Sequence, residues 1–294
     1  MLFSPYKDIT VNMDWNTDIM RTAVTGSIIP LVGTGGLFPA QVPKLGAITL
    51  AFATGECGSE NWAGVPAQAF ADANIKSLDS AGLSYVVSTG GAAGSFTCGS
   101  TAGFASFIAR YYTPHMVGVD FDIEAGQTPA DITNLVSAVA YAESVYPTMR
   151  FSFTLATLAA SDGSYAGLNT LGDSVMQAIK AAGLKNYTID LMVMDYGAPS
   201  TAACVVSNGQ CDMGQSAIQA VVNLEHTYGV PSSQIELTPM SGANDSAGET
   251  FSLQDVDTVT AYAVKNGLAG LHYWSLDRDS QLQYTNEFIK DLGR

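Results

Sequence analysis

The sequence predicts an α/β fold, a single (β/α)8 barrel of the TIM type that spans residues 1–294. Short apolar runs rich in Val, Ile, Phe and Tyr alternate about eight times with longer amphipathic stretches, the pattern of parallel strands joined by helices. The length of 294 residues suits one such barrel, which commonly takes roughly 250 residues. An open doubly wound sheet is the main alternative fold, and it usually carries a Gly-rich phosphate-binding turn after its first strand. Neither Gly-x-Gly-x-x-Gly nor Gly-x-x-x-x-Gly-Lys-Ser/Thr occurs in the sequence, which favours the barrel.

The elements follow in order along the chain. The predicted strands are residues 9–12, 47–52, 84–88, 117–122, 150–155, 189–194, 235–239 and 270–275. Between them, residues 66–81 and 129–146 are predicted helices with proline near the first turn, followed by Gly82 and Pro147. Residues 169–182 and 253–266 are predicted helices that end before a glycine.

Composition excludes several classes of partner. The net charge of −15 leaves no basic stripe to replace phosphate counterions, so neither nucleic acid nor an anionic membrane is an expected partner. No apolar run approaches the roughly 20 residues that span a bilayer. The N-terminus also has no basic and apolar leader, so the protein is either cytosolic or has lost a signal peptide.

The four cysteines favour the second of these alternatives. Cys57 and Cys98 follow consecutive predicted strands, so their loops can lie side by side, and Cys204 and Cys211 occupy one polar loop. Two loop disulfides are the simplest interpretation and imply an oxidising compartment; four free thiols are the alternative. We therefore expect a secreted protein whose signal peptide has been removed. No Cys-x-x-Cys pair occurs, and we expect neither a metal nor a cofactor.

Three acids at period two stand out on the fourth predicted strand. Alternation along an extended chain places Asp120, Asp122 and Glu124 on one face, with apolar residues between them on the other. Neighbouring buried carboxyls repel one another and titrate as a coupled set. This arrangement is typical of acid/base chemistry at neutral pH, and the C-terminal end of the strand is where a barrel carries its active site.

The acid strand resembles that of glycoside hydrolase family 18, the chitinases, whose fourth strand reads Asp-x-x-Asp-x-Asp-x-Glu. Gly118 also fits, whereas Val117 stands where the family has its first Asp. The string Asp-Phe-Asp-Ile-Glu is close to bacterial members and to the plant class III chitinases. Similar motifs occur on other strands: Ser88 to Gly91, Phe52, Met192 to Tyr196, and Trp274.

The resemblance implies a retaining hydrolysis in which the substrate supplies the nucleophile. Glu124 would protonate the glycosidic oxygen, and the 2-acetamido oxygen of the sugar would attack the anomeric carbon to form an oxazolinium ion. Asp122 would hold the acetamido group and stabilise the cation, while Asp120 would tune the charge of Asp122. Glu124 would then act as the base that activates water.

The sixth strand departs from the family pattern Met-x-Tyr-Asp. If Met192 is aligned with the Met of this pattern, Met194 takes the position of the Tyr and Asp195 that of the Asp. Tyr196 then lies one residue after the end of the pattern. Alternation along the strand places Met192, Met194 and Tyr196 on one face and Asp195 on the opposite face, unless a β-bulge rotates Asp195 inward. Both Asp195 and Tyr196 therefore remain candidates for the contact to the acetamido group.

Candidate substrate-binding residues complete the expected site: Trp274, Phe52, Gly91, Met192, Met194 and Trp15. Each has a structural alternative, since Trp274, Met192 and Met194 could be ordinary barrel filling and Trp15 could be loop packing. The neighbouring polar residues Asn244 and Asp245 after the seventh strand are a further candidate.

The sequence thus predicts a monomeric chitinase that cleaves β-1,4 linkages in chitin or N-acetylglucosamine oligomers. The short segment between the seventh and eighth strands favours an open groove and endo cleavage. Two alternatives remain open: an endo-β-N-acetylglucosaminidase that acts on N-glycan cores, and a catalytically inactive barrel that only binds chitin.

Overall fold

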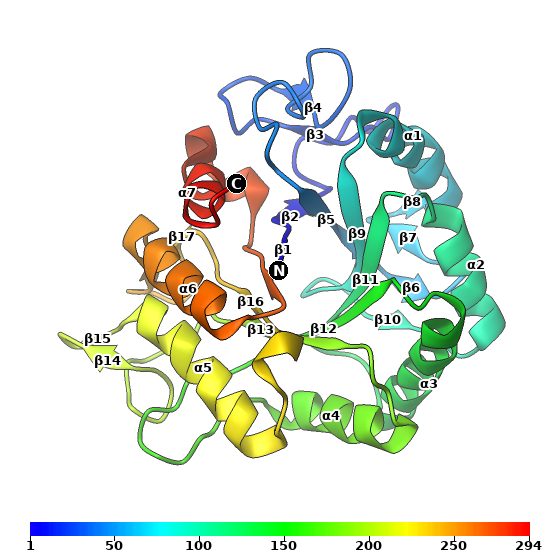
Figure 1. The fold of residues 1–294 in the computed structure, drawn as a ribbon. Helices are drawn as coiled ribbons and strands as arrows, with labels where there is room; N and C mark the ends of the chain where they lie inside the picture. Colours follow the sequence, from blue (N-terminus) through cyan, green and yellow to red (C-terminus); the bar gives the residue numbers. More distant parts are fainter.

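The computed structural model describes residues 1–294, and its parallel strands form a barrel that the helices surround (Figure 1). The sheet order is β1 (Leu2–Phe3), β19 (Gly270–Leu271), β16 (Ile235–Thr238), β13 (Thr188–Met192), β12 (Arg150–Ala156), β11 (Met116–Ile123), β9 (Ser84–Gly90), β5 (Ala47–Ala53) and β2 (Tyr6–Asp8). Every neighbouring pair is parallel. Because β1 and β2 are two pieces of the first strand, the sheet closes on itself, and the predicted α/β barrel is confirmed.

The prediction of the first strand at residues 9–12 is wrong. Ile9 to Asn12 form a turn, and the strand lies earlier, at β1 and β2. Pro5 hides it in the sequence, because proline has no backbone N–H and usually marks an interruption. In the structure the Pro5 carbonyl still accepts a hydrogen bond from the Thr49 N–H (3.0 Å), while the Tyr6 N–H donates to the Tyr273 carbonyl on the other side (3.1 Å).

The other predicted elements occur with small shifts. The helices are α1 (Ala67–Ala81), α2 (Thr101–Tyr111), α3 (Pro129–Val145), α4 (Thr170–Ala182), α5 (Met213–Tyr228), α6 (Leu253–Asn266) and α7 (Gln283–Asp291). The four helices with predicted ends agree to within one residue, because their caps form as expected. Asn169 caps α4 through the Gly172 N–H (2.9 Å), and Gly183 ends it with a φ of +66°.

The first strand differs from the others in having no helix after it. Residues 9–46 form turns and the short antiparallel pair β3 (Arg21–Thr22) and β4 (Ile29–Pro30). In Figure 1 this segment lies between α7 and α1, at the place that the first helix of a complete barrel would take. The long excursion leaves the C-terminal end of the first strand bordered by loops.

Alternation on β11 separates the core from the barrel interior. Val119, Phe121 and Ile123 are buried against the helices, and the Phe121 ring packs on those of Phe153 (5.3 Å) and Phe104 (5.9 Å). Asp120 and Asp122 are equally buried, but they point into the barrel. The strand thus carries an apolar outer face and an acidic inner face, as the period-two pattern predicts.

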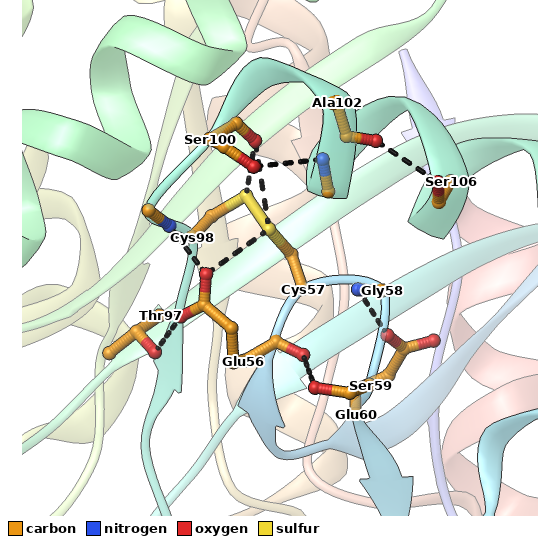
Figure 2. The surroundings of a disulfide bond; sticks show 12 residues. Glu56, Cys57, Gly58, Ser59, Glu60, Thr97, Cys98, Ser100, Ala102 and Ser106 are labelled. Carbon is orange, nitrogen blue, oxygen red and sulfur yellow. Dashed lines mark hydrogen bonds between the residues drawn. A yellow bond between two sulfur atoms is a disulfide. The ribbon is translucent and has the colours of Figure 1, made fainter.

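Two disulfides fasten loops at the strand ends, and they pair Cys57 with Cys98 and Cys204 with Cys211. Figure 2 shows the first of them, beside the short parallel pair β6 (Gly55–Glu56) and β10 (Phe96–Thr97). The Glu56 carboxylate adds to the link by accepting hydrogen bonds from the Thr97 hydroxyl and the Gly99 N–H, both at 2.6 Å. Among the helices, none combines the length and the apolar character needed to cross a membrane.

Candidate active site

A cavity of about 940 Å³ opens at the C-terminal ends of the barrel strands. All eight strands or the loops that follow them contribute to its lining, including Tyr6, Phe52, Ala92, Asp122, Glu124, Thr154, Ala156, Met192, Met194, Asp195, Thr238, Met240, Asp245 and Trp274. The cavity therefore lies where the barrel fold places active sites. It contains most of the residues that the sequence singles out.

Asp120 lies deepest, and hydroxyl groups surround it. One carboxylate oxygen accepts hydrogen bonds from Tyr6 (3.0 Å) and Ser88 (2.5 Å), and the other from Ser152 and Thr154 (both 2.7 Å). Burial raises the pKa of Asp120, as does the nearby charge of Asp190, while the hydroxyl donors oppose the rise. Parallel pairing explains the arrangement, since Asp120 stands beside Ser88 on β9 and Ser152 on β12.

Asp122 and Glu124 continue the acid face towards the cavity. Asp122 is 5% exposed, and its Oδ1 has no hydrogen-bond partner. Burial raises its pKa well above the ordinary value, and the charges of Glu124, Asp120 and Asp190 raise it further. Burial also raises the pKa of the half-buried Glu124. Both groups thus keep protons to a higher pH than free carboxyls do, which is the property that a general acid needs.

Asp190 is a fourth acid of the site that the sequence analysis missed. Its Oδ2 accepts hydrogen bonds from Thr238 (2.6 Å), Thr154 (3.2 Å) and Tyr6 (3.2 Å), so it shares two hydroxyl partners with Asp120. The sequence spacing could have revealed Asp190, because it precedes Met192 by two residues and alternation places both on the inner face of β13.

Below Asp190 the barrel floor contains a second buried cluster. Ligand atoms of Asp190, Glu236 and His272 lie within 4.8 Å of one another, close enough to bind a metal ion. The Arg150 guanidinium contacts Glu236, however, and supplies positive charge at the same place. The His272 Nδ1 lies 3.0 Å from the Ser4 carbonyl, and its Nε2 faces Glu236 at 3.5 Å. Burial lowers the pKa of His272, and Asp190 Oδ1 and His272 Nε2 have no hydrogen-bond partner, so the cluster is a buried polar group that is only partly paired.

Three aromatic rings form the opposite side of the cavity. Trp274 stacks on Phe52 with a centroid distance of 5.5 Å, and Tyr6 lies 6.1 Å from Trp274 and 6.2 Å from Phe52. Tyr6 was not a sequence candidate, because it lies on the strand that Pro5 disguises. Gly91 is outside the lining, but a Cβ there would lie 2.6 Å from the Phe52 ring. Its role in the structure is to make room for that ring.

The loop after β13 separates the two candidates that the sequence left open. Met192, Met194 and Asp195 line the cavity, and Tyr196 does not. Asp195 turns inward because its φ is +53°, and its carboxylate accepts a hydrogen bond from the Ser246 N–H (2.6 Å). Tyr196 packs in the core instead, and its backbone N–H binds the Glu249 carboxylate (3.1 Å). The geometry therefore favours Asp195 over Tyr196.

Trp15 lies outside the cavity. It stands in the turn between Asp14 and Ile19 and is 54% exposed. Trp62, the other tryptophan in a predicted loop, is fully buried, donates a hydrogen bond to the Tyr111 hydroxyl (2.9 Å) and stacks on Phe70. Of the three tryptophans, Trp274 alone faces the acids across the cavity.

Comparison with known proteins places this geometry in context. No family model matches the chain. It is 30% identical over 228 residues to a probable bifunctional chitinase/lysozyme of Escherichia coli K12, and 29% identical over 228 residues to Endochitinase 11 of Metarhizium anisopliae. Each match covers 70% of the chain, but only 24% and 42% of the respective relatives, so the chain spans less than half the length of either.

Solved structures share the fold across the whole chain. The catalytic domain of a hyperthermophilic chitinase from Pyrococcus furiosus superposes with a TM-score of 0.70 at 22% identity, covering 99% of this chain and 94% of that one. The catalytic domain of a family GH18 chitinase from the fern Peteris ryukyuensis gives 0.59 at 15% identity, with full coverage of both chains. The resemblance to the family 18 chitinases is confirmed, and these relatives and structural neighbours are glycoside hydrolases.

Proposed function

We propose that this relative of the family 18 chitinases hydrolyses β-1,4 linkages between N-acetylglucosamine units, with retention at the anomeric carbon. The observation that carries the proposal is the position of Glu124, a half-buried acid with a raised pKa, above Asp122 and opposite Trp274 in one cavity. No second carboxylate nucleophile is needed if the substrate supplies its own.

In the first step Glu124 donates its proton to the glycosidic oxygen, and the bond from that oxygen to the anomeric carbon breaks. The carbonyl oxygen of the 2-acetamido group attacks the same carbon and forms an oxazolinium ion. Asp122 passes its proton to Asp120, accepts a hydrogen bond from the acetamido N–H and then stabilises the cation through its negative charge. Asp195 is the candidate for the contact to the acetamido group from the β13 side, where it lines the cavity.

In the second step the ionised Glu124 takes a proton from water, and the water oxygen attacks the anomeric carbon. The bond to the acetamido oxygen breaks, so two displacements leave the configuration unchanged. Trp274, Phe52 and Tyr6 form an aromatic surface on which the reacting unit rests. Asp120, held by four hydroxyls beneath Asp122, shares a proton with Asp122 and so tunes its charge.

Two measurements on N-acetylglucosamine oligomers test the proposal. NMR of the first products should show the β-anomer at the new reducing end, whereas inversion would produce the α-anomer. Fully deacetylated oligomers of the same length should not be cleaved, since they lack the internal nucleophile. Cleavage of both substrates at equal rates would contradict the substrate-assisted mechanism.

The same assays distinguish the alternatives. Release of glycans from a glycoprotein without cleavage of chitin oligomers would indicate the N-glycan activity. Binding of oligomers without any cleavage would indicate an inactive barrel. Secretion as a monomer is part of the proposal, and two observations support the extracellular location: the two disulfides, and the fungal relative that is named an endochitinase.

A further inference from the structure

The loops that follow the sixth and seventh strands hold one another beside the cavity. The sixth loop begins after β13 and contains residues 195–197, and the seventh begins after β16 and contains the hairpin of β17 (Gly242–Ala243) and β18 (Thr250–Phe251). Asp195 lines the cavity, whereas Glu249 of the hairpin is 3% exposed and lies outside the lining. Glu249 is therefore a buried carboxyl behind the site, and the proposed mechanism does not use it.

Glu249 binds two consecutive backbone N–H groups of the sixth loop. Its Oε2 accepts a hydrogen bond from the Tyr196 N–H (3.1 Å), and its Oε1 accepts one from the Gly197 N–H (2.7 Å). Burial raises the pKa of Glu249; the two N–H groups oppose the rise, and the charge of Asp195 adds to it. Hydrogen bonds to an ionised carboxylate are stronger than those between neutral groups, so the two bonds link the loops firmly.

The bend that turns Asp195 towards the cavity lies directly before these N–H groups. Asp195 has a φ of +53°, and Gly197 has one of +84°. A residue with a side chain rarely adopts a positive φ, because its Cβ then approaches the backbone oxygen, so surrounding contacts have to stabilise the conformation of Asp195. The bonds from Glu249 to the next two residues supply such contacts on the C-terminal side of the bend.

Two further contacts involve Asp195 itself. The Ser246 N–H donates to Asp195 Oδ1 (2.6 Å), and the Asp195 N–H donates to Asn244 Oδ1 (3.4 Å). The Asn244 amide also donates to the carbonyls of Met240 (3.1 Å) and Gly242 (3.2 Å). Asn244 thus supports the contact between the loops and does not line the cavity. Because Ser246 binds only Oδ1, the second carboxylate oxygen of Asp195 is free for a substrate.

The hairpin that carries Glu249 is anchored independently of the sixth loop. The Asn244 N–H donates to the Glu249 carbonyl (3.0 Å), and the Glu249 N–H donates to the Ser246 carbonyl (3.2 Å). Phe251 is fully buried, and its carbonyl accepts a hydrogen bond from the Tyr284 hydroxyl on α7 (2.7 Å). The Glu249 carboxylate therefore extends from a fixed backbone, and the sixth loop takes its position from it.

We propose that Glu249 is a positioning residue of the active site: by holding the backbone of residues 196–197, it keeps Asp195 turned into the cavity for contact with the acetamido group. The inference rests on the proposed function for the role of Asp195. Glu249 does not line the cavity, so its effect on the reaction passes through Asp195. A purely structural carboxyl would instead have an effect that does not depend on Asp195.

A double-mutant cycle separates these two roles. Glu249→Gln keeps the size of the side chain, but its amide nitrogen is a donor and faces one of the two N–H groups, so it binds only one of them. We expect kcat on N-acetylglucosamine oligomers to fall about tenfold, which corresponds to about 1.4 kcal/mol, with less than about a twofold change in KM. In an Asp195→Ala background the same substitution should lower kcat by less than about twofold, because the side chain that Glu249 positions is gone.

Glu56→Gln is the matched control. Glu56 also braces a loop at the C-terminal ends of the strands, through the Thr97 hydroxyl and the Gly99 N–H, but it lies outside the cavity lining. It should leave kcat unchanged in both backgrounds. An equal fall from Glu249→Gln with and without Asp195 would assign Glu249 a structural role and overturn the inference.

A crystal structure of the Glu249→Gln variant provides a measurement that does not depend on activity. An Asp195 side chain turned out of the cavity would support the inference, and an Asp195 that keeps its positive φ and its place in the lining would overturn it. If Glu249→Gln does not fold, Glu249→Asp, which keeps the charge but shortens the reach, takes its place in both measurements with the same expected results. A wild-type protein that cleaves no oligomer would contradict the proposed function, and the crystal structure would still decide whether Glu249 holds Asp195 in the cavity.

Discussion

The two sides of the cavity are built in different ways. On one side, Tyr6, Phe52 and Trp274 pack against one another as rings, and Trp274 and Phe52 are nearly parallel at 14°. On the other side, Asp122 and Glu124 have raised pKa values because burial disfavours their charged forms. The aromatic side acts through its contact area with the substrate, and the acid side acts through proton transfer. Substitutions on the two sides should therefore change different kinetic constants.

The largest effect is expected on the acid side, from Glu124→Gln. The amide keeps the shape of the side chain but can neither donate a proton to the leaving oxygen nor take one from water. We expect kcat on N-acetylglucosamine oligomers to fall by about 10²–10⁴-fold with a much smaller change in KM, because acid catalysis contributes that much to the rate.

Glu287→Gln on α7 serves as the matched control, since Glu287 is remote from the cavity lining. It should leave both constants within twofold of the wild type. If Glu124→Gln instead raised KM while kcat stayed the same, Glu124 would belong with the binding residues, and the distinction between the two sides would fail.

On the aromatic side, Trp274→Ala should act mainly through binding. Loss of a large buried contact of about 1.5–3 kcal/mol predicts a fall of about 10–100-fold in kcat/KM, most of it from a higher KM. Trp15→Ala is the matched tryptophan variant outside the cavity, and it should change the kinetics on soluble oligomers by less than twofold. Equal effects of the two variants would mean that Trp15 also binds the soluble substrate.

The acid side was largely predictable from the sequence, and the aromatic side only in part. Alternation along a strand depends on local geometry alone, so the common face of Asp120, Asp122 and Glu124 follows from their spacing. Tyr6 escaped because Pro5 suggests a break, although strand one needs no N–H donor at that residue. Asp190 was readable from its spacing to Met192 and was overlooked.

The limits of alternation explain what the sequence left open. β13 ends at Met192, so the alternation rule no longer applies to Asp195 and Tyr196, and the positive φ of Asp195 decides which of them faces the cavity. The cavity wall formed by residues 157–158 and 164–169 depends on the packing of that loop on Asn223 and Thr227, which are far from it in the sequence. Such contacts between distant segments have no periodicity to reveal them.

A smaller effect is expected from Asp190→Asn, which tests whether the floor acids tune the catalytic ones. The charge of Asp190 contributes to raising the pKa of Asp120 and of Asp122, which titrates together with Glu124. Removing that charge lowers these pKa values, so the carboxyl set loses its proton at a lower pH. The alkaline limb of the kcat/KM profile should therefore shift to lower pH, by up to about one unit.

Glu236→Gln is the control for this pH shift. It also removes a buried acid from the barrel floor, but the charge of Glu236 is not among the causes of the raised pKa values of Asp120, Asp122 and Glu124. The alkaline limb should stay in place. A uniform loss of activity in Asp190→Asn, without a shift of the limb, would assign Asp190 a purely structural role.

The smallest difference concerns the disulfides, one on each side of the cavity. Cys57–Cys98 fastens the loops after β5, which carries Phe52, and β9; Cys204–Cys211 closes part of the loop that begins near Asp195. The bonds span 41 and 7 residues, and loop-closure entropy then predicts contributions of about 4 and about 2 kcal/mol. Replacing each pair with alanines and measuring Tm by calorimetry should therefore show the larger loss for the Cys57–Cys98 pair, by about 3–6 °C. The reverse order would mean that the acid side depends more on its covalent link than chain entropy alone predicts, and that the segment 201–204, which holds residues 159–161, needs that link to stay folded.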